Sequence, residues 1–172
     1  MKFKEEPSTA GAQDHLKLKD KESRVGVFRG DPLEFYSVWN NSKSTPSKKG
    51  EPGARFRFKV NFVTKDEGQN YVALVWEQGP TVYNLLKSLN EDYPLENTVM
   101  KITRFGSTKD TTSYTILPIP KGHEVTPALE AMLAKVKLNE LHAGPAQVQE
   151  AEPEHFDQSF APTAQHEEQL PF

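Results

Sequence analysis

The sequence predicts a mainly β protein, built as a five-stranded Greek-key barrel with one helix between the third and fourth strands. Three observations predict it. Five short segments have the alternating or uniformly apolar composition of strands. One segment with the leucine spacing of a helix stands between the third and fourth of them. Both ends of the chain lack apolar periodicity, so we expect them to bury nothing.

The first strand is predicted in two pieces, residues 25–28 and 33–39, because both are rich in β-branched and aromatic residues. Residues 40–53 have the composition of a flexible loop, with Asn, Ser, Lys, Pro and Gly. The second and third strands, residues 54–63 and 71–77, flank a polar turn that contains a glycine, which predicts a hairpin.

A helix is predicted between Pro80, which fits a first helical turn, and Pro94, which ends it. Its apolar positions recur with helical spacing at Val82, Leu85, Leu86 and Leu89. Two more strands, residues 98–105 and 111–119, surround a second polar turn. A C-terminal amphipathic helix is predicted after Thr126, with an apolar face of Leu129, Met132, Leu133 and Val136.

This order of elements is that of the OB-fold, a partly open barrel whose second and third strands and whose loops 1-2 and 4-5 bind oligonucleotides. Other five-stranded barrels share the order. A chain of 172 residues allows one domain with tails. We expect a flexible arm of residues 1–23, a domain of residues 24–141, and a disordered acidic tail of residues 142–172.

The composition excludes several classes of protein. The chain has no cysteine, which excludes disulfide frameworks and cysteine nucleophiles and fits a reducing compartment. It has neither the apolar run of a signal peptide nor the ~20 apolar residues of a membrane span. We therefore expect a soluble cytoplasmic protein.

Charge is divided unequally along the chain. Seven of the 24 acidic residues and none of the 21 basic residues lie beyond Lys137, which leaves 17 acids against 21 bases in residues 1–137. A basic body with an acidic tail indicates a polyanionic ligand for the body.

The segment RFRFKVNF, residues 55–62, alternates between two kinds of side chain. Its phenylalanines fall on one side of a strand, and Arg55, Arg57 and Lys59 fall on the other. The simplest interpretation of the basic side is a solvated surface. However, three cations on one face repel one another, and the next predicted strand offers no acidic partner before Glu77. We therefore predict that the basic side contacts nucleic-acid phosphates.

Further contacts are predicted where the OB-fold binds its ligand. Trp39, beside the lysine-rich loop, and Phe105, on the same side of its strand as Lys101, are the candidate base-stacking rings. Tyr36, Tyr71, Trp76 and Tyr114 are further candidates for stacking, but most aromatic residues in a domain of this size belong to the core. The candidate cations outside the basic strand are Lys48, Lys49, Lys101, Arg104 and Lys109.

Patterns typical of enzymes are missing. The segment GSTKDTT lacks the second glycine and the spacing of a phosphate-binding P-loop. No histidine pair has the spacing of metal ligands, and the carboxylates form no cluster like that of two-metal nucleases. We expect no enzymatic activity, no cofactor and no metal site.

The run RFRFKVNFVTKDEGQNYVALVWEQGPTVYNLL, followed by MKITRFGSTKDTTSYTILPIP, resembles the core of bacteriophage single-stranded DNA-binding proteins of the OB-fold type. The second part is similar to a recurring pattern of that family at Arg104, Gly106, Asp110, Thr111 or Thr112, Tyr114 and Pro118. The resemblance covers roughly residues 25–120. A chain without cysteine cannot hold the zinc ribbon that many phage relatives carry.

The last residues, EEQLPF, are similar to the acidic tip by which bacterial single-stranded DNA-binding proteins hold replication and repair partners, although glutamates replace an aspartate run. The resemblance implies that Glu167, Glu168, Leu170, Pro171 and Phe172 bind such a partner.

Together the two resemblances imply a protein that binds and protects single-stranded DNA in replication or recombination, in the host cytoplasm if a phage encodes it. An RNA-binding OB module and a protein-interaction scaffold are the alternatives.

Overall fold

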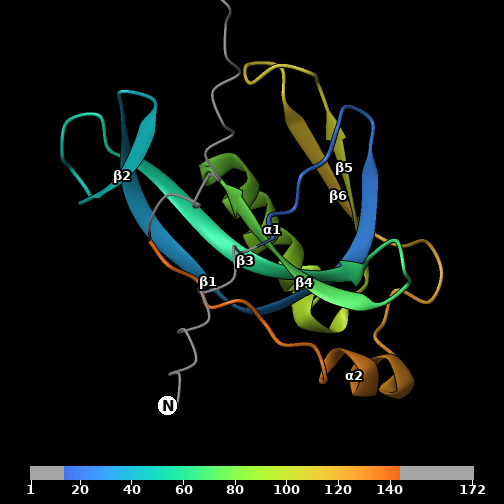
Figure 1. The fold of residues 1–172 in the computed structure, drawn as a ribbon. Helices are drawn as coiled ribbons and strands as arrows, with labels where there is room; N and C mark the ends of the chain where they lie inside the picture. The colour runs from blue at the N-terminus through green and yellow to red at the C-terminus, as the bar shows by residue number, and fades with distance from the viewer. Residues whose placement is uncertain (1–13, 144–172) are drawn as a thin grey trace, which may run out of the picture.

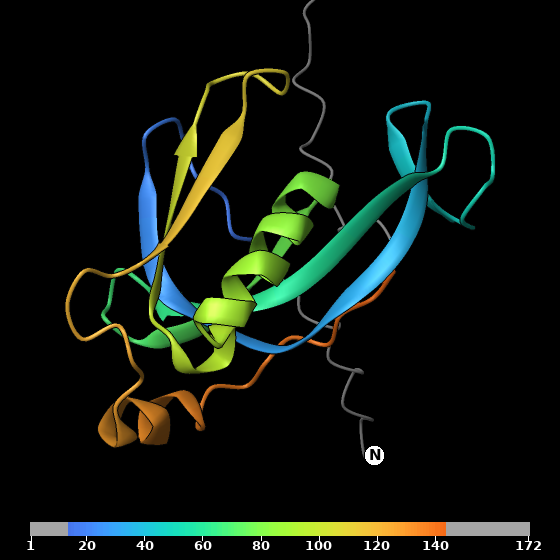
Figure 2. The same cartoon turned by 180° about the vertical axis from the view of Figure 1, so that it is seen from behind.

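The computed structural model describes residues 14–143 and contains one open antiparallel sheet of six strands with two α-helices (Figures 1 and 2). The predicted mainly β character is confirmed. The elements are β1 (Ser23–Asn40), β2 (Lys43–Ser47), β3 (Arg55–Lys65), β4 (Tyr71–Gln78), α1 (Pro80–Asp92), a 3-10 turn η1 (Leu95–Asn97), β5 (Met100–Phe105), β6 (Ser113–Pro118) and α2 (Pro127–Leu133).

Hydrogen-bonded strands follow one another in the order β4-β3-β1-β5-β6, and β2 pairs with the end of β1. Within residues 14–143 no backbone pairing joins β4 to β6, so hydrogen bonds do not close the predicted barrel. Side chains span the gap instead. The rings of Trp76 on β4 and Tyr114 on β6 meet edge to face, with centroids 5.3 Å apart.

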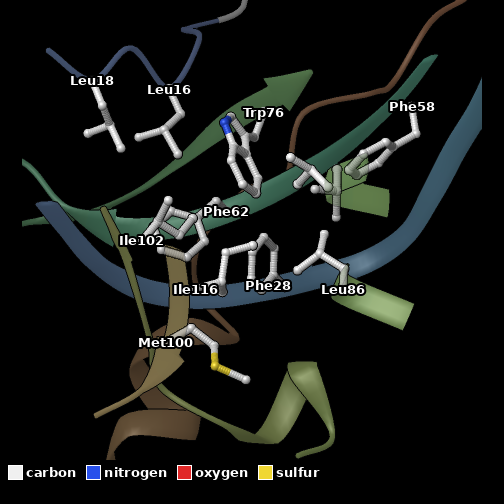
Figure 3. Packing of buried hydrophobic residues seen from close by; sticks show 12 residues of the cluster. Leu16, Leu18, Phe28, Phe58, Phe62, Trp76, Leu86, Met100, Ile102 and Ile116 are labelled. Atoms are coloured by element: carbon white, nitrogen blue, oxygen red, sulfur yellow. The ribbon is translucent and has the colours of Figure 1, made fainter. Parts of the chain in front are cut away.

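Residues 14–22, which were predicted to belong to a flexible arm, are part of the fold. The Leu16 N–H donates to the Val75 carbonyl (2.9 Å), and the Val75 N–H donates to the Asp14 carbonyl (2.9 Å), at the outer edge of β4. Leu16 and Leu18 are buried in the main core (Figure 3). The arm prediction was wrong for these residues because two alternating leucines are too short a pattern to indicate a strand.

The two predicted pieces of the first strand form one strand of 18 residues, β1. Its register against β3 shifts between Arg29 and Leu33, which is the signature of a β-bulge. Gly30 adopts a φ of 71° there, and its N–H donates to Glu96 Oε1 (2.9 Å). The bulge accommodates a glycine and a proline without ending the strand.

Residues 40–53 are not the loop without regular structure that was predicted, because β2 lies within them and pairs with β1. Helix α1 is confirmed, with Val82 and Leu86 buried. Helix α2 has only seven residues, and Met132, predicted on its apolar face, is 53% exposed. No helix among the described residues is long and apolar enough to cross a membrane.

Buried side chains form one cluster on each face of the sheet. On the α1 face, Phe58, Val60 and Phe62 of β3 pack with residues of β1, β4, β5, β6 and α1 (Figure 3). On the opposite face, Val27 and Val63 pack with α2 and the strand ends around it. The middle of β3 is therefore buried on both sides, although its sequence predicts one polar side.

Candidate nucleic-acid interface

The basic side of β3 belongs to the sheet face turned away from α1, which we call the outer face. Residues that pair in register across antiparallel strands share a face. Lys59 therefore lies in one row with Leu33 of β1 and Glu77 of β4. The next two rows pair Phe35 with Arg57 and Ser37 with Arg55. The predicted division of β3 into a phenylalanine side and a basic side is thus present in the sheet.

Glu77 neutralises part of the basic side. The Arg57 side chain donates to Glu77 Oε1 from Nε (3.1 Å) and from Nη2 (3.0 Å). Lys59 Nζ lies 3.8 Å from the other carboxylate oxygen. The argument from unbalanced repulsion is therefore wrong for these two cations. Arg55 is exposed at the start of the strand, so a phosphate could reach its side chain.

Lys59 is buried, with 2% of its surface exposed. Its ammonium group donates to the His142 carbonyl (2.8 Å) and lies 5.4 Å from the centre of the Phe35 ring. Burial lowers the pKa of Lys59 below its usual value, and the Glu77 carboxylate offsets part of that effect. In this conformation a phosphate cannot reach the ammonium group, so phosphate contact by Lys59 stays a prediction without structural support.

The group that covers Lys59 belongs to residues 134–143, a segment that we call the strap (orange in Figure 1). It leaves α2 through a turn and then continues without regular secondary structure. Asn61 and Asn139 fix it with two reciprocal hydrogen bonds, each 3.0 Å long. The Asn139 side chain also donates to the Ala73 carbonyl of β4 (2.8 Å). The strap thus closes the middle of the outer face, and its contact at His142 lies one residue beyond the predicted end of the domain.

The end of the sheet beyond the strap is open. Trp39, near the end of β1, is 63% exposed, and Lys109 Nζ from the β5–β6 turn lies 5.7 Å from the centre of its ring. Two predicted contacts that are far apart in the sequence are thus brought together. Lys48 and Lys49, which are exposed, belong to the connection that follows β2. An exposed ring with a cation beside it can stack a base and attract its phosphate.

The remaining predicted contacts of the β5–β6 hairpin have different surroundings. Arg104 has a structural role, because its side chain donates to the Leu18 carbonyl (2.6 Å) and to Thr112 Oγ1 (3.0 Å). It ties the N-terminal segment to the turn that carries Lys109. Lys101 is exposed and pairs in register with Val25 and Leu117, which are exposed apolar residues.

Of the predicted stacking rings, Phe105 at the end of β5 is exposed, as stacking requires. Trp76, by contrast, is buried in the core, as predicted. The predicted partner-binding residues Glu167, Glu168, Leu170, Pro171 and Phe172 lie outside the described residues.

Within residues 14–143 no group of three or more histidine or carboxylate side chains is placed to hold a metal ion.

No protein-family model matches the chain, and comparison with curated proteins and with solved structures finds no similar one. The resemblance to phage single-stranded DNA-binding proteins therefore stays a prediction, and a functional proposal must rest on the geometry.

Proposed function

We propose that the protein binds single-stranded DNA, largely without sequence preference, and protects it during replication or recombination. In this proposal Trp39 stacks on a base and Lys109 contacts a neighbouring phosphate. The observation that carries the proposal is the exposed indole of Trp39 with an ammonium group 5.7 Å from its ring centre. An exposed indole beside an ammonium group offers a ring for a base and a charge for its phosphate, which favours a binding role.

The strand order supports this proposal. Without β2, the order β4-β3-β1-β5-β6 is that of an OB-fold whose third and fifth strands have not paired. The helix α1 follows the third of these strands, as it does in that fold. The loops that flank an oligonucleotide there correspond to the β1–β3 connection and the β5–β6 turn. These are the segments that place Lys48, Lys49 and Lys109.

A fluorescence titration with oligo-dT tests the proposal. The chain has two tryptophans and Trp76 is 1% exposed, so quenching by a bound strand reports on Trp39. We expect saturable quenching in the parent protein. Trp39→Ala should weaken binding, measured by anisotropy of a labelled strand, by ~1–3 kcal/mol, the usual contribution of one stacked base.

Leu117→Ala is the matched control, because Leu117 is 55% exposed but lies on the β6 surface, away from the proposed site. Its affinity for oligo-dT should equal that of the parent. If Trp39→Ala also bound like the parent, the assignment of this surface would be wrong. Competition between DNA and RNA of the same sequence separates the proposed function from an RNA-binding module, and failure of the parent to bind either would favour a scaffold.

The partner-binding role of the acidic tip is part of the proposal. The tip combines carboxylates with an apolar end, which suits a partner pocket that is apolar and rimmed by basic residues. Deleting residues 165–172 should abolish recruitment of a replication or repair protein in a pull-down. Affinity for oligo-dT should stay unchanged or rise slightly at low salt, where charge competition is least screened. A fall in DNA affinity would contradict this role.

A further inference from the structure

A second cationic groove lies at the opposite end of the outer face from Trp39. It has a volume of about 820 Å³, and it is bounded by the β3–β4 hairpin and by the chain that leaves α2. Lys65 and Tyr71, which pair in register, form one wall, and Lys135 and Lys137 form the other. Local sequence patterns do not predict that these lysines meet, because they come from segments about 70 residues apart that only the fold brings together.

The charge in this groove is not neutralised in the way that Glu77 neutralises the middle of β3. No salt bridge within residues 14–143 involves Lys65, Lys135 or Lys137. Asp66 and Glu67 belong to the adjoining turn, but neither lines the groove. The Asp66 carboxylate accepts a hydrogen bond from the Asn70 N–H (2.8 Å). Three exposed lysines around one hollow therefore present a net positive surface.

The groove also has an aromatic wall. Lys65 Nζ lies 5.4 Å from the centre of the Tyr71 ring. The Trp39 site has the same combination of a ring and an ammonium group. Acidic peptides require only the cations, whereas a single strand uses the ring and the cations together. The combination therefore favours a nucleic acid as the occupant.

We propose that this groove is a second contact site for the single strand bound at Trp39, with phosphates at Lys65, Lys135 and Lys137 and a base at Tyr71. The inference rests on the proposed function. β3 has 11 residues, so its two ends are about 33 Å apart at the usual strand rise. Bridging them requires on the order of 10 nucleotides at the ~3.4 Å spacing of charges along a stacked strand. One protein molecule therefore binds more nucleotides than contacts at Trp39 alone would require.

The test compares two strand lengths on the full chain carrying Lys65→Gln, Lys135→Gln and Lys137→Gln together. For a dT strand of about 20 nucleotides, affinity should fall about 10-fold or more at low salt. The slope of log K against log salt should flatten by about 2, from three lost contacts of ~0.7 each. For a strand of about 5 nucleotides, quenching of Trp39 should occur at the same concentration as in the parent, because that strand cannot reach both sites.

The control removes three exposed lysines elsewhere, with Lys19→Gln, Lys87→Gln and Lys121→Gln, and so changes the net charge equally. This variant should lose much less affinity for the long strand. Equal losses of affinity in both variants would show a general effect of net charge and would overturn the inference. An unchanged or raised affinity of the groove variant for the long strand would also overturn it. If the parent itself fails to bind oligo-dT, the proposed function fails first.

Discussion

The middle of the outer face and its open end contain the same kinds of residue and differ in what surrounds them. Lys59 and Phe35 in the middle are buried, the strap covers the lysine, and a carboxylate lies opposite it. Lys109 and Trp39 at the end form a similar cation–ring pair in solvent. The first pair is enclosed by the fold and the second is available to a ligand. A basic or aromatic residue on a strand thus becomes a candidate contact only when its cross-strand and covering partners leave it accessible.

The largest expected effect is the difference in stability lost when a buried aromatic ring and an exposed aromatic ring are each removed. Phe58→Ala should lower the free energy of unfolding by ~3–5 kcal/mol, because the ring is fully buried beneath α1. Trp39→Ala should leave thermal stability nearly unchanged, because most of its ring is in solvent. Melting curves of the two variants measure the difference. A large fall in the melting temperature of Trp39→Ala would show that its ring belongs to the core, and the open end would then not differ from the covered middle.

The strap provides the second test. Asn139→Ala removes the hydrogen bond that its side chain donates to the Ala73 carbonyl and leaves that carbonyl unsatisfied, so stability should fall by ~1–3 kcal/mol. Hydrogen exchange around residues 137–143 should accelerate as well. Asn84→Ala, on the exposed side of α1, is the control and should change neither quantity. If Asn139→Ala had no effect on stability or exchange, the strap would not be held as described.

A smaller effect separates the two arginines of β3. Arg55 is exposed, whereas Arg57 donates twice to Glu77, so only Arg55 has its full charge available for a phosphate. Arg55→Ala should weaken oligo-dT binding roughly 5-fold at low salt, and Arg57→Ala should weaken it less. Anisotropy titrations of the two variants side by side give the comparison. Equal losses would show that Glu77 releases Arg57 when a strand binds.

The smallest effect concerns pH. The pKa of Lys59 is lowered in the folded state by burial, so between that value and the unfolded value of 10.5 the unfolded chain binds more protons. Stability attributable to this residue therefore rises as the pH rises through that window. Urea unfolding of the parent and of Lys59→Met at several alkaline pH values should show a gain in the parent that the variant lacks. A parent whose relative stability falls over the same range would contradict the burial of a charged ammonium.

Much of the fold follows from local sequence patterns, and the site follows only in part. The helical spacing of apolar residues that begins at Val82 predicted α1, and the alternation in β3 predicted which residues share a face. The pairing of Lys59 with Glu77 could also have been predicted, because the two residues are equally far in sequence from Gly68 in the hairpin turn. The Asn61–Asn139 contact could not have been predicted, because asparagines in unrelated segments give no periodic signal. The meeting of Trp39 and Lys109 likewise depends on tertiary structure alone.

The salt dependence of oligo-dT binding in Lys109→Gln and Lys59→Met tests the central distinction most directly. Each variant removes one ammonium group that lies near an aromatic ring, one at the open end and one beneath the strap. Lys109→Gln should flatten the slope of log K against log salt by about 0.7, the value for one lost phosphate contact, and Lys59→Met should leave the slope unchanged. A flattened slope in Lys59→Met with an unchanged slope in Lys109→Gln would contradict the account and place the strand under the strap.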